Sequence, residues 1–299
     1  MSWNRKPSFV AQPADTPASQ IVMRLLVEGE GLAPTPIGTA FWITGHLAAT
    51  AKHNIEYIIH KFGQPRGRSL IDGSPAIIDY SMRLYQILPG PEYAIWDVDN
   101  LTTSTESDIA LMHLKLNGYS GPTQPRGGFG LNVCLLPPRH GSKIAALGYH
   151  SSRAATKPNP DGGHDINLDD VTQATAGIVT KIFPNGRDRG MYPFPCFQMN
   201  ARFDSGMSGG PIFDERGRVV GIISGSMPED GELPAVSYGA TLGPIMNIPL
   251  SGKASGYPWA RTAFPASDRV ERGIIKVADL QAYREKQSRS ARRAESLQG

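Results

Sequence analysis

Short runs of hydrophobic residues, separated by Gly, Pro, Asp and Asn, recur along most of the chain. Runs of this length with turn residues at their ends are typical of β-strands. In the first half we predict strands at residues 21–28, 37–44, 56–60 and 109–116. In the second half we predict strands at residues 133–137, 143–150, 175–183, 196–203, 218–225 and 235–242. Many short strands in regular succession indicate a barrel or a sandwich.

Two segments depart from this strand pattern. Residues 119–130 are rich in Pro and Gly and lie between the two groups of strands, so we predict an interdomain linker there. Residues 268–287 carry charges of both signs and apolar positions three and four apart, which predicts a helix with Ser267 as its N-cap. Gly273 weakens the helical pattern in the first half of that segment.

Composition agrees with a globular protein built from short elements. The 299 residues suffice for one large domain or two ordinary ones, and 33 Gly and 25 Pro favour many turns. The two cysteines, Cys134 and Cys196, are expected to be free thiols. The chain has no apolar run typical of a signal peptide or a membrane span, so we expect a cytoplasmic protein without a transmembrane segment.

The net charge of +3 belongs entirely to the C-terminal tail, because seven basic and four acidic residues follow from Glu271 onward. A neutral body has no electrostatic footprint for phosphate groups, so we expect no binding of nucleic acid. The tail is a candidate for a partner or oligomer contact, although terminal charge runs more often face solvent.

The stretch FDSGMSGGPIF, residues 203–213, places Ser208 between glycines that relax the backbone and leave its hydroxyl uncrowded. It fits a hydrolase elbow, a phosphate-binding loop or a plain structural turn. All seven histidines precede Ser208, whereas the α/β-hydrolase elbow needs a histidine after its serine. A phosphate loop needs a lysine after its glycines, and none is present. The order His, Asp, Ser and the structural turn stay open.

A nucleophilic serine needs a histidine to accept its proton and a carboxylate to orient that histidine. His53 follows a short apolar strand and is expected in a polar turn, and Asp108 stands at the start of the strand at 109–116. Each of these two residues alone fits an exposed polar position. Together with Ser208 they form a candidate triad.

The chain resembles the trypsin-like serine peptidases of the chymotrypsin fold, and within them the bacterial Deg/Htr-type proteases without a PDZ domain. The resemblance covers about residues 20–250 and rests on ATAKH, SDIALM, KIAALGYH, TAGIVTK, FQMNARFDSGMSGGPIF and VVGIISGS. It implies an all-β fold of two six-stranded antiparallel β-barrels with a helical C-terminal tail. The expected organisation is a flexible leader at 1–19, a first barrel at 20–130, a second barrel at 131–250, and a linker with a basic helical tail at 251–299.

The resemblance also implies roles for individual residues. Ser208 would be the nucleophile, His53 the general base and then acid, and Asp108 the orienting carboxylate. The backbone N–H groups of Gly206 and Ser208 would form the oxyanion hole. Met207 stands where zymogen-type trypsins have an acidic residue, so we expect no activation by a freed N-terminal amine.

Substrate contacts are implied at two further places. The strand end at Ser224, Gly225 and Ser226 would pair with the backbone of a substrate. Arg202 and Phe203 lie where the family builds part of its primary specificity pocket. An inward Arg202 would favour acidic side chains and an inward Phe203 small aliphatic ones, and the sequence leaves both open.

The sequence therefore predicts a serine endopeptidase that cleaves polypeptides through an acyl-enzyme, with no metal or organic cofactor. The alternative is a protease-fold scaffold that binds peptides, or a regulated effector with little constitutive catalysis. A third possibility is an esterase that does not cleave peptides.

Overall fold

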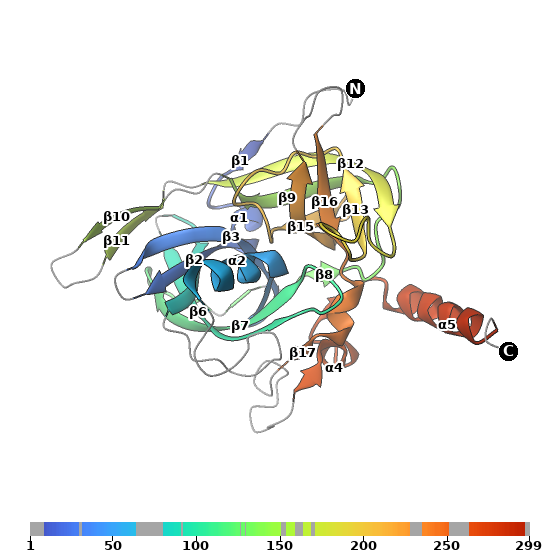
Figure 1. Ribbon diagram of the computed structural model, residues 1–299. Helices are drawn as coiled ribbons and strands as arrows, with labels where there is room; N and C mark the ends of the chain where they lie inside the picture. The colour runs from blue at the N-terminus through green and yellow to red at the C-terminus, as the bar shows by residue number, and fades with distance from the viewer. Residues whose placement is uncertain are drawn as a thin grey trace.

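Two sets of six antiparallel strands each close into a barrel, which confirms the predicted fold class (Figure 1). The computed structural model describes residues 9–29, 32–63, 80–90, 92–125, 127–128, 130–150, 154–158, 164–168, 171–227, 235–250 and 263–296. The first barrel closes in the order β2-β3-β4-β7-β6-β5. Its strands are β2 (Val22–Gly29), β3 (Leu32–Thr44), β4 (Leu47–Thr50), β5 (Tyr80–Ile87), β6 (Tyr93–Thr103) and β7 (Ala110–Tyr119).

The second barrel follows the order β14-β9-β12-β13-β16-β15, and the pairing of β15 with β14 closes it. Its strands are β9 (Lys143–Tyr149), β12 (Thr172–Phe183), β13 (Cys196–Met199), β14 (Pro211–Asp214), β15 (Val219–Met227) and β16 (Val236–Ala240). Two short parallel strands, β8 (Asn132–Val133) and β19 (Lys276–Val277), extend this sheet beside β15. The N-terminal strand β1 (Val10–Gln12) pairs with β12.

Smaller elements complete the described chain. Two hairpins pair β10 (Ala154–Pro158) with β11 (His164–Leu168), and β17 (Pro249–Leu250) with β18 (Phe264–Pro265). The helices are α1 (Pro17–Ile21), α2 (Lys52–Phe62), the 3-10 helix η1 (Gly243–Asn247), α4 (Ala266–Glu271) and α5 (Leu280–Ser296). None of the helices within the described ranges has the length and apolar character needed to cross a membrane.

Hydrophobic side chains form a core inside each barrel and a third core between them. In the first barrel Trp42 and Trp96 meet edge to face, with ring centroids 5.0 Å apart. The third core joins side chains of both barrels, such as Phe41 and Ile222, to Val270 of the C-terminal segment. Because each barrel buries one face of its strands in this shared core, the two barrels are held in a fixed relation.

The strand predicted at residues 56–60 is wrong, because these residues belong to α2. The buried or half-buried side chains Ile55, Ile58, Ile59 and Phe62 are spaced three and four apart, which is the period of a helix face. The apolar run was too short for its period to be recognised within 56–60 alone. His53 therefore lies in the first turn of a helix, and its predicted place in a polar turn is also wrong.

The single helix predicted at residues 268–287 is broken into α4 and α5. The chain leaves α4 at Glu271 and turns at Gly273, whose φ of 69° is in the left-handed region. It then forms β19 before α5 begins. Ser267 lies inside α4, whose N-cap is Pro265, so its prediction as a cap is wrong.

Other strand predictions differ from the structure in their lengths. β8 ends at Val133 and β13 at Met199, so the predicted strands at 133–137 and 196–203 are too long. β5 and β6 were not predicted at all. Both lie in the sequence between α2 and Asp108, and in the barrel they connect β2 to β7.

The C-terminal segment is fastened to the second barrel by polar contacts as well as by β19. Asp279 accepts hydrogen bonds from the backbone N–H groups of Leu135 and Leu136, at 2.8 and 2.9 Å. The N–H of Ala278 donates to the carbonyl of Val133 at 2.8 Å. Beyond this attachment α5 projects away from the body of the protein (Figure 1).

Replacing Asp279 with alanine should lower the free energy of unfolding by about 1–3 kcal/mol, because two backbone N–H groups lose their acceptor. The free energy of unfolding of Asp279→Asn should lie between those of the wild type and Asp279→Ala, since asparagine keeps one acceptor oxygen. Urea unfolding followed by tryptophan fluorescence measures the change. Glu295→Ala, on the exposed end of α5, is the matched control and should change stability by less than about 0.5 kcal/mol. An equal free energy of unfolding in Asp279→Ala and Glu295→Ala would contradict the role of Asp279 in fastening the C-terminal segment to the second barrel.

Candidate active site

His53 and Asp108 meet on the first barrel, as the sequence predicts. Nδ1 of His53 lies 2.8 Å from Oδ2 of Asp108, and the backbone N–H of His53 donates to Oδ1 at 2.8 Å. The His53 side chain is 39% exposed and that of Asp108 only 6%. The carboxylate is therefore shielded, while the imidazole faces outward with its Nδ1 held. This arrangement leaves Nε2 of His53 as the nitrogen available for proton transfer.

Asp108 has one further partner, which the sequence did not predict in this role. Ser224, in β15 of the second barrel, donates its hydroxyl to Oδ2 of Asp108 at 2.5 Å. Ser224 is buried, and we expected it at the substrate-binding strand edge. The two oxygens of Asp108 thus accept three hydrogen bonds in a shielded position. Both oxygens of the shielded carboxylate therefore have hydrogen-bond donors.

The surroundings of His53 shift its pKa upward from the usual value. Burial lowers the pKa because it disfavours the charged imidazolium, but the hydrogen bond and negative charge of Asp108 outweigh burial. The net direction is upward, so the imidazole is a stronger base than a free histidine. A base of this kind is suited to accept a proton from a hydroxyl group near neutral pH.

Ser208 lies in the second of two consecutive turns that share Met207. The N–H of Met207 donates to the carbonyl of Asp204 at 3.1 Å, and the N–H of Gly210 donates to that of Met207 at 3.0 Å. The third residue of each turn is a glycine with positive φ: 92° at Gly206 and 89° at Gly209. This pattern is that of a type II turn, which requires a residue tolerant of positive φ at its third position. The spacing of the glycines around Ser208 therefore has a backbone cause. We call residues 204–210 the double turn.

Backbone and side-chain groups of the first barrel donate hydrogen bonds to the carbonyl groups of the double turn. The carbonyl of Ser208 accepts from the N–H of Thr39 and from Nδ2 of Asn54, both at 2.9 Å. The carbonyl of Gly206 accepts from the hydroxyl of Thr39 at 2.8 Å. Asn54 also donates to the hydroxyl of Thr50 at 3.0 Å. Since Asn54 directly follows His53, these bonds bring the backbone of Ser208 next to the helix that carries His53.

These three first-barrel residues were missed by the sequence analysis. The only available signal for Asn54 was its position after His53, and Thr39 and Thr50 appeared as ordinary polar members of strands. All three are buried. Only the structure shows this burial, so the sequence held no signal that could have identified Thr39 and Thr50.

The strand end at Ser224, Gly225 and Ser226 has one open edge. Within the described residues, Gly225 and Ser226 pair with β16 on one side, and β14 pairs with β15 only as far as Ile222 on the other. The unpaired backbone edge lies directly beyond the double turn, because the N–H of Gly209 donates to the carbonyl of Ile223. An extended chain can pair with such an edge.

The two predicted pocket residues point in different directions. Phe203 is buried in the core of the second barrel, and its carbonyl accepts a hydrogen bond from the hydroxyl of Ser226 at 2.8 Å. Arg202 is exposed and forms two hydrogen bonds with the carboxylate of Asp204, at 3.0 and 2.7 Å. Of the two side chains, Phe203 is the inward one.

Both cysteines are buried free thiols, as predicted. Burial raises the pKa of Cys134 and of Cys196 to about 11. Both thiols therefore stay protonated at neutral pH. Since the thiolate is the reactive form, neither cysteine is suited to act as a nucleophile.

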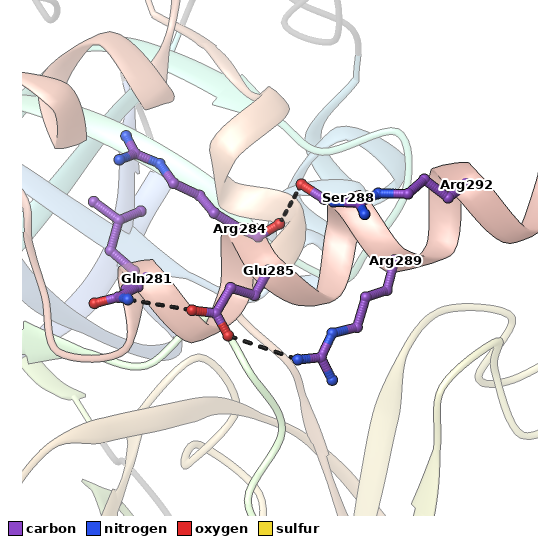
Figure 2. A pocket seen from close by; sticks show the side chains of 7 residues that line it. Gln281, Arg284, Glu285, Ser288, Arg289 and Arg292 are labelled. Atoms are coloured by element: carbon purple, nitrogen blue, oxygen red, sulfur yellow. Dashed lines mark hydrogen bonds and ion pairs between the residues drawn. The ribbon is translucent and has the colours of Figure 1, made fainter.

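A separate surface hollow lies along α5 and does not involve the candidate triad (Figure 2). Only α5 contributes to its lining, which consists of Leu280, Gln281, Arg284, Glu285, Ser288, Arg289 and Arg292. Side chains of one turn contact those of the next, as between Gln281 and Glu285 at 3.2 Å. The hollow is thus a space between neighbouring side chains of one exposed helix. A partner or oligomer contact through this tail stays a prediction.

Comparisons with known proteins found one family model and a set of solved structures. The family model described as a trypsin-like peptidase domain matches residues 38–222. No curated protein matches the chain. Among solved structures, the active form of the Rv3671c protease from M. tuberculosis is 17% identical, with a TM-score of 0.47, and the match covers 82% of this chain and 90% of that chain. The inactive form of the same protease is also 17% identical, with a TM-score of 0.44 and coverage of 81% and 91%.

The resemblance to the Deg/Htr-type branch stays a prediction. The matched range includes His53, Asp108 and Ser208, and it spans more than half of the 299 residues. The chain therefore belongs to the trypsin-like peptidase family, the serine proteases of the chymotrypsin fold.

Proposed function

We propose that the protein is a serine endopeptidase in which Ser208 is the nucleophile, His53 the base and Asp108 the orienting carboxylate. One observation carries the proposal. The His53–Asp108 pair on the first barrel stands beside the double turn of the second barrel, and Asn54 joins the two by its hydrogen bond to the Ser208 carbonyl. A Ser-His-Asp mechanism needs the three residues at one site, and this contact supports the proposal because it brings the backbone of Ser208 to the helix that carries His53.

The reaction is acyl transfer in two steps. The Ser208 hydroxyl attacks the carbonyl carbon of the peptide bond while Nε2 of His53 takes its proton. His53 then gives this proton to the leaving amine, which leaves an acyl group on Ser208. A water molecule, deprotonated by His53, attacks the acyl group, and Ser208 regains its proton as the acid product leaves. Asp108 stays ionised throughout and stabilises the imidazolium.

The oxyanion of each tetrahedral intermediate is bound by the N–H groups of Gly206 and Ser208. The positive φ of Gly206 supports this assignment, because in a type II turn it goes with the orientation of the central peptide, between Ser205 and Gly206, which carries the Gly206 N–H. The substrate backbone pairs with the open edge at Ser224–Ser226. Met207 is fully buried and apolar, so ordering of the turn requires no freed N-terminal amine.

A fluorophosphonate probe tests the nucleophile. We expect labelling of the folded wild-type protein at Ser208 and none of Ser208→Ala or of unfolded protein. Turnover of a peptide substrate should fall on the order of a millionfold in Ser208→Ala, because the triad acts as a unit. Ser205→Ala, an exposed serine in the same loop, is the matched control and should still be labelled. A folded wild-type protein that resists labelling favours the peptide-binding scaffold, and ester cleavage without peptide cleavage favours an esterase.

The acid limb of the pH profile tests His53. Activity should be lost as pH falls through the raised pKa of His53, since the protonated imidazole cannot accept a proton. In Asp108→Asn the hydrogen bond to a charged partner and the negative charge are gone while burial remains. The limb should therefore move to lower pH, and the plateau rate should drop by about ten-thousandfold. Rate measurements from pH 4 to 9 on both proteins give the two limbs. If the acid limb of Asp108→Asn stayed at the pH of the wild type, the contact with Asp108 would not be the cause of the raised pKa of His53.

Substrate preference follows from the inward Phe203 and the outward Arg202. Of these two residues the inward one is the apolar Phe203, which packs in the core, while the positive charge of Arg202 is paired with Asp204 outside, so an acidic substrate side chain gains no cation from either. We expect a peptide library to be cut after small aliphatic residues. Arg202→Ala should keep this preference, whatever its effect on rate. Cleavage mainly after Asp or Glu, lost in Arg202→Ala, would be the opposite result.

A further inference from the structure

Phe9, the first described residue of the chain, contacts two side chains that bind the double turn. The Phe9 ring stacks on the His150 ring, with centroids 4.6 Å apart and planes inclined by 27°. The guanidinium group of Arg202 also lies over the Phe9 ring, with Cζ 5.2 Å from the ring centroid. Phe9 packs at the same time against the core of the second barrel. One side chain of the N-terminal segment therefore touches two polar groups from distant parts of the sequence.

Those two polar groups are the side-chain partners of a single carboxylate. Asp204 accepts from Nε2 of His150 at 2.7 Å and from Arg202 at 3.0 and 2.7 Å. Asp204 is also the first residue of the double turn, and its carbonyl accepts the N–H of Met207. The side chain of Asp204 thus fixes the residue from which the turn through Gly206 starts.

The N-terminal segment is itself held in place. Directly after Phe9, β1 pairs with β12 in the register Val10–Ala174, Ala11–Gln173 and Gln12–Thr172. His150 directly follows β9, which pairs with the same stretch of β12. The end of β9 also lies in close contact with the double turn, because a Cβ added at Gly148 would lie 2.9 Å from Cα of Met207. Phe9, His150 and the double turn are consequently connected through β9 and β12.

We propose that Phe9 is a positioning residue for the oxyanion hole, acting through the stacked His150 and Arg202 on Asp204. The proposal rests on the function proposed above. Without the ring, His150 and Arg202 lose their common contact, and Asp204 no longer has a single fixed position from which Gly206 presents its N–H. An oxyanion donor that is displaced or mobile stabilises the transition state less, while binding of the substrate strand to β15 is unaffected.

The plain alternative is that Phe9 only adds stability to the N-terminal strand. The two explanations differ in what they change. A packing role lowers the free energy of unfolding and leaves the folded enzyme fully active. A positioning role lowers the rate of bond formation at Ser208 in fully folded protein, without changing the concentration at which the substrate or probe saturates the site.

The test is the saturation kinetics of Ser208 inactivation by a fluorophosphonate, measured at a temperature where each full-length variant is folded by circular dichroism. Phe9→Ala should lower the maximal inactivation rate about tenfold, less than the hundredfold to thousandfold that loss of an oxyanion donor costs, with half-saturation unchanged. Phe9→Tyr keeps the stack and should restore the rate. Val10→Ala is the matched control, because Val10, the next residue in the chain and the first of β1, is 58% exposed and should react like wild type.

A double-mutant cycle separates the proposed path from independent effects. If Phe9 acts through His150, Phe9→Ala combined with His150→Ala should be no slower than the slower single variant. Additive losses would overturn the proposal, as would a wild-type rate in Phe9→Ala or an equal loss in Val10→Ala. Absence of labelling in the wild type would instead refute the proposed function, so the two failures are distinguishable.

Discussion

The docking of the two barrels on the backbone of Ser208 is the contact on which the site depends. The Ser208 carbonyl belongs to the second barrel but accepts both of its hydrogen bonds from Thr39 and Asn54 of the first. The approach is so close that a Cβ at Gly38 would lie 2.8 Å from this carbonyl oxygen and 2.6 Å from Nδ2 of Asn54. Only a residue without a side chain permits it. A small shift between the barrels would break these bonds.

The dependence runs in both directions. The first barrel holds the nucleophile loop, and the second barrel holds the first barrel's carboxylate, because the Ser224 hydroxyl donates to Asp108. Each partner that lost its bond would be left as a buried polar group, which costs about 1–3 kcal/mol. Correct docking therefore stabilises both halves of the candidate triad at once. Such a reciprocal arrangement favours one relative position of the barrels over nearby ones.

Much of this architecture was readable from the sequence, and the parts that were not have physical reasons. Short strands predicted a barrel or a sandwich, and glycine spacing predicted a turn at Ser208, because strand pattern and positive φ are local properties. The two six-stranded barrels were implied only by the resemblance to the trypsin-like peptidases. The helix at residues 56–60 was predicted as a strand because the segment considered was too short. Ile55 and Phe62, which reveal the helical period, lie outside it. Thr39 and Ser224 could not be assigned, because their roles come from partners 167 and 116 residues away.

The direction of Arg202 and Phe203 was also beyond the sequence. Neighbouring residues in an extended segment point to opposite sides, and a shift of one residue reverses the assignment. In the structure Phe203 packs in the core of the second barrel, and the Asp204 carboxylate binds Arg202 outside. Burial of the aromatic ring favours this orientation, and the exposed ion pair adds little to it.

Met207 shows how the double turn can be ordered without an ion pair at its centre. A carboxylate at this fully buried position would need a charged partner, because an unpaired buried charge is strongly unfavourable. Methionine needs none, and its backbone alone closes both turns. The charged groups lie instead at the start of the turn, on Asp204 and its partners near the surface. The turn is consequently ordered by core packing from within and by Phe9, His150 and Arg202 from outside, all of which are set when the chain folds.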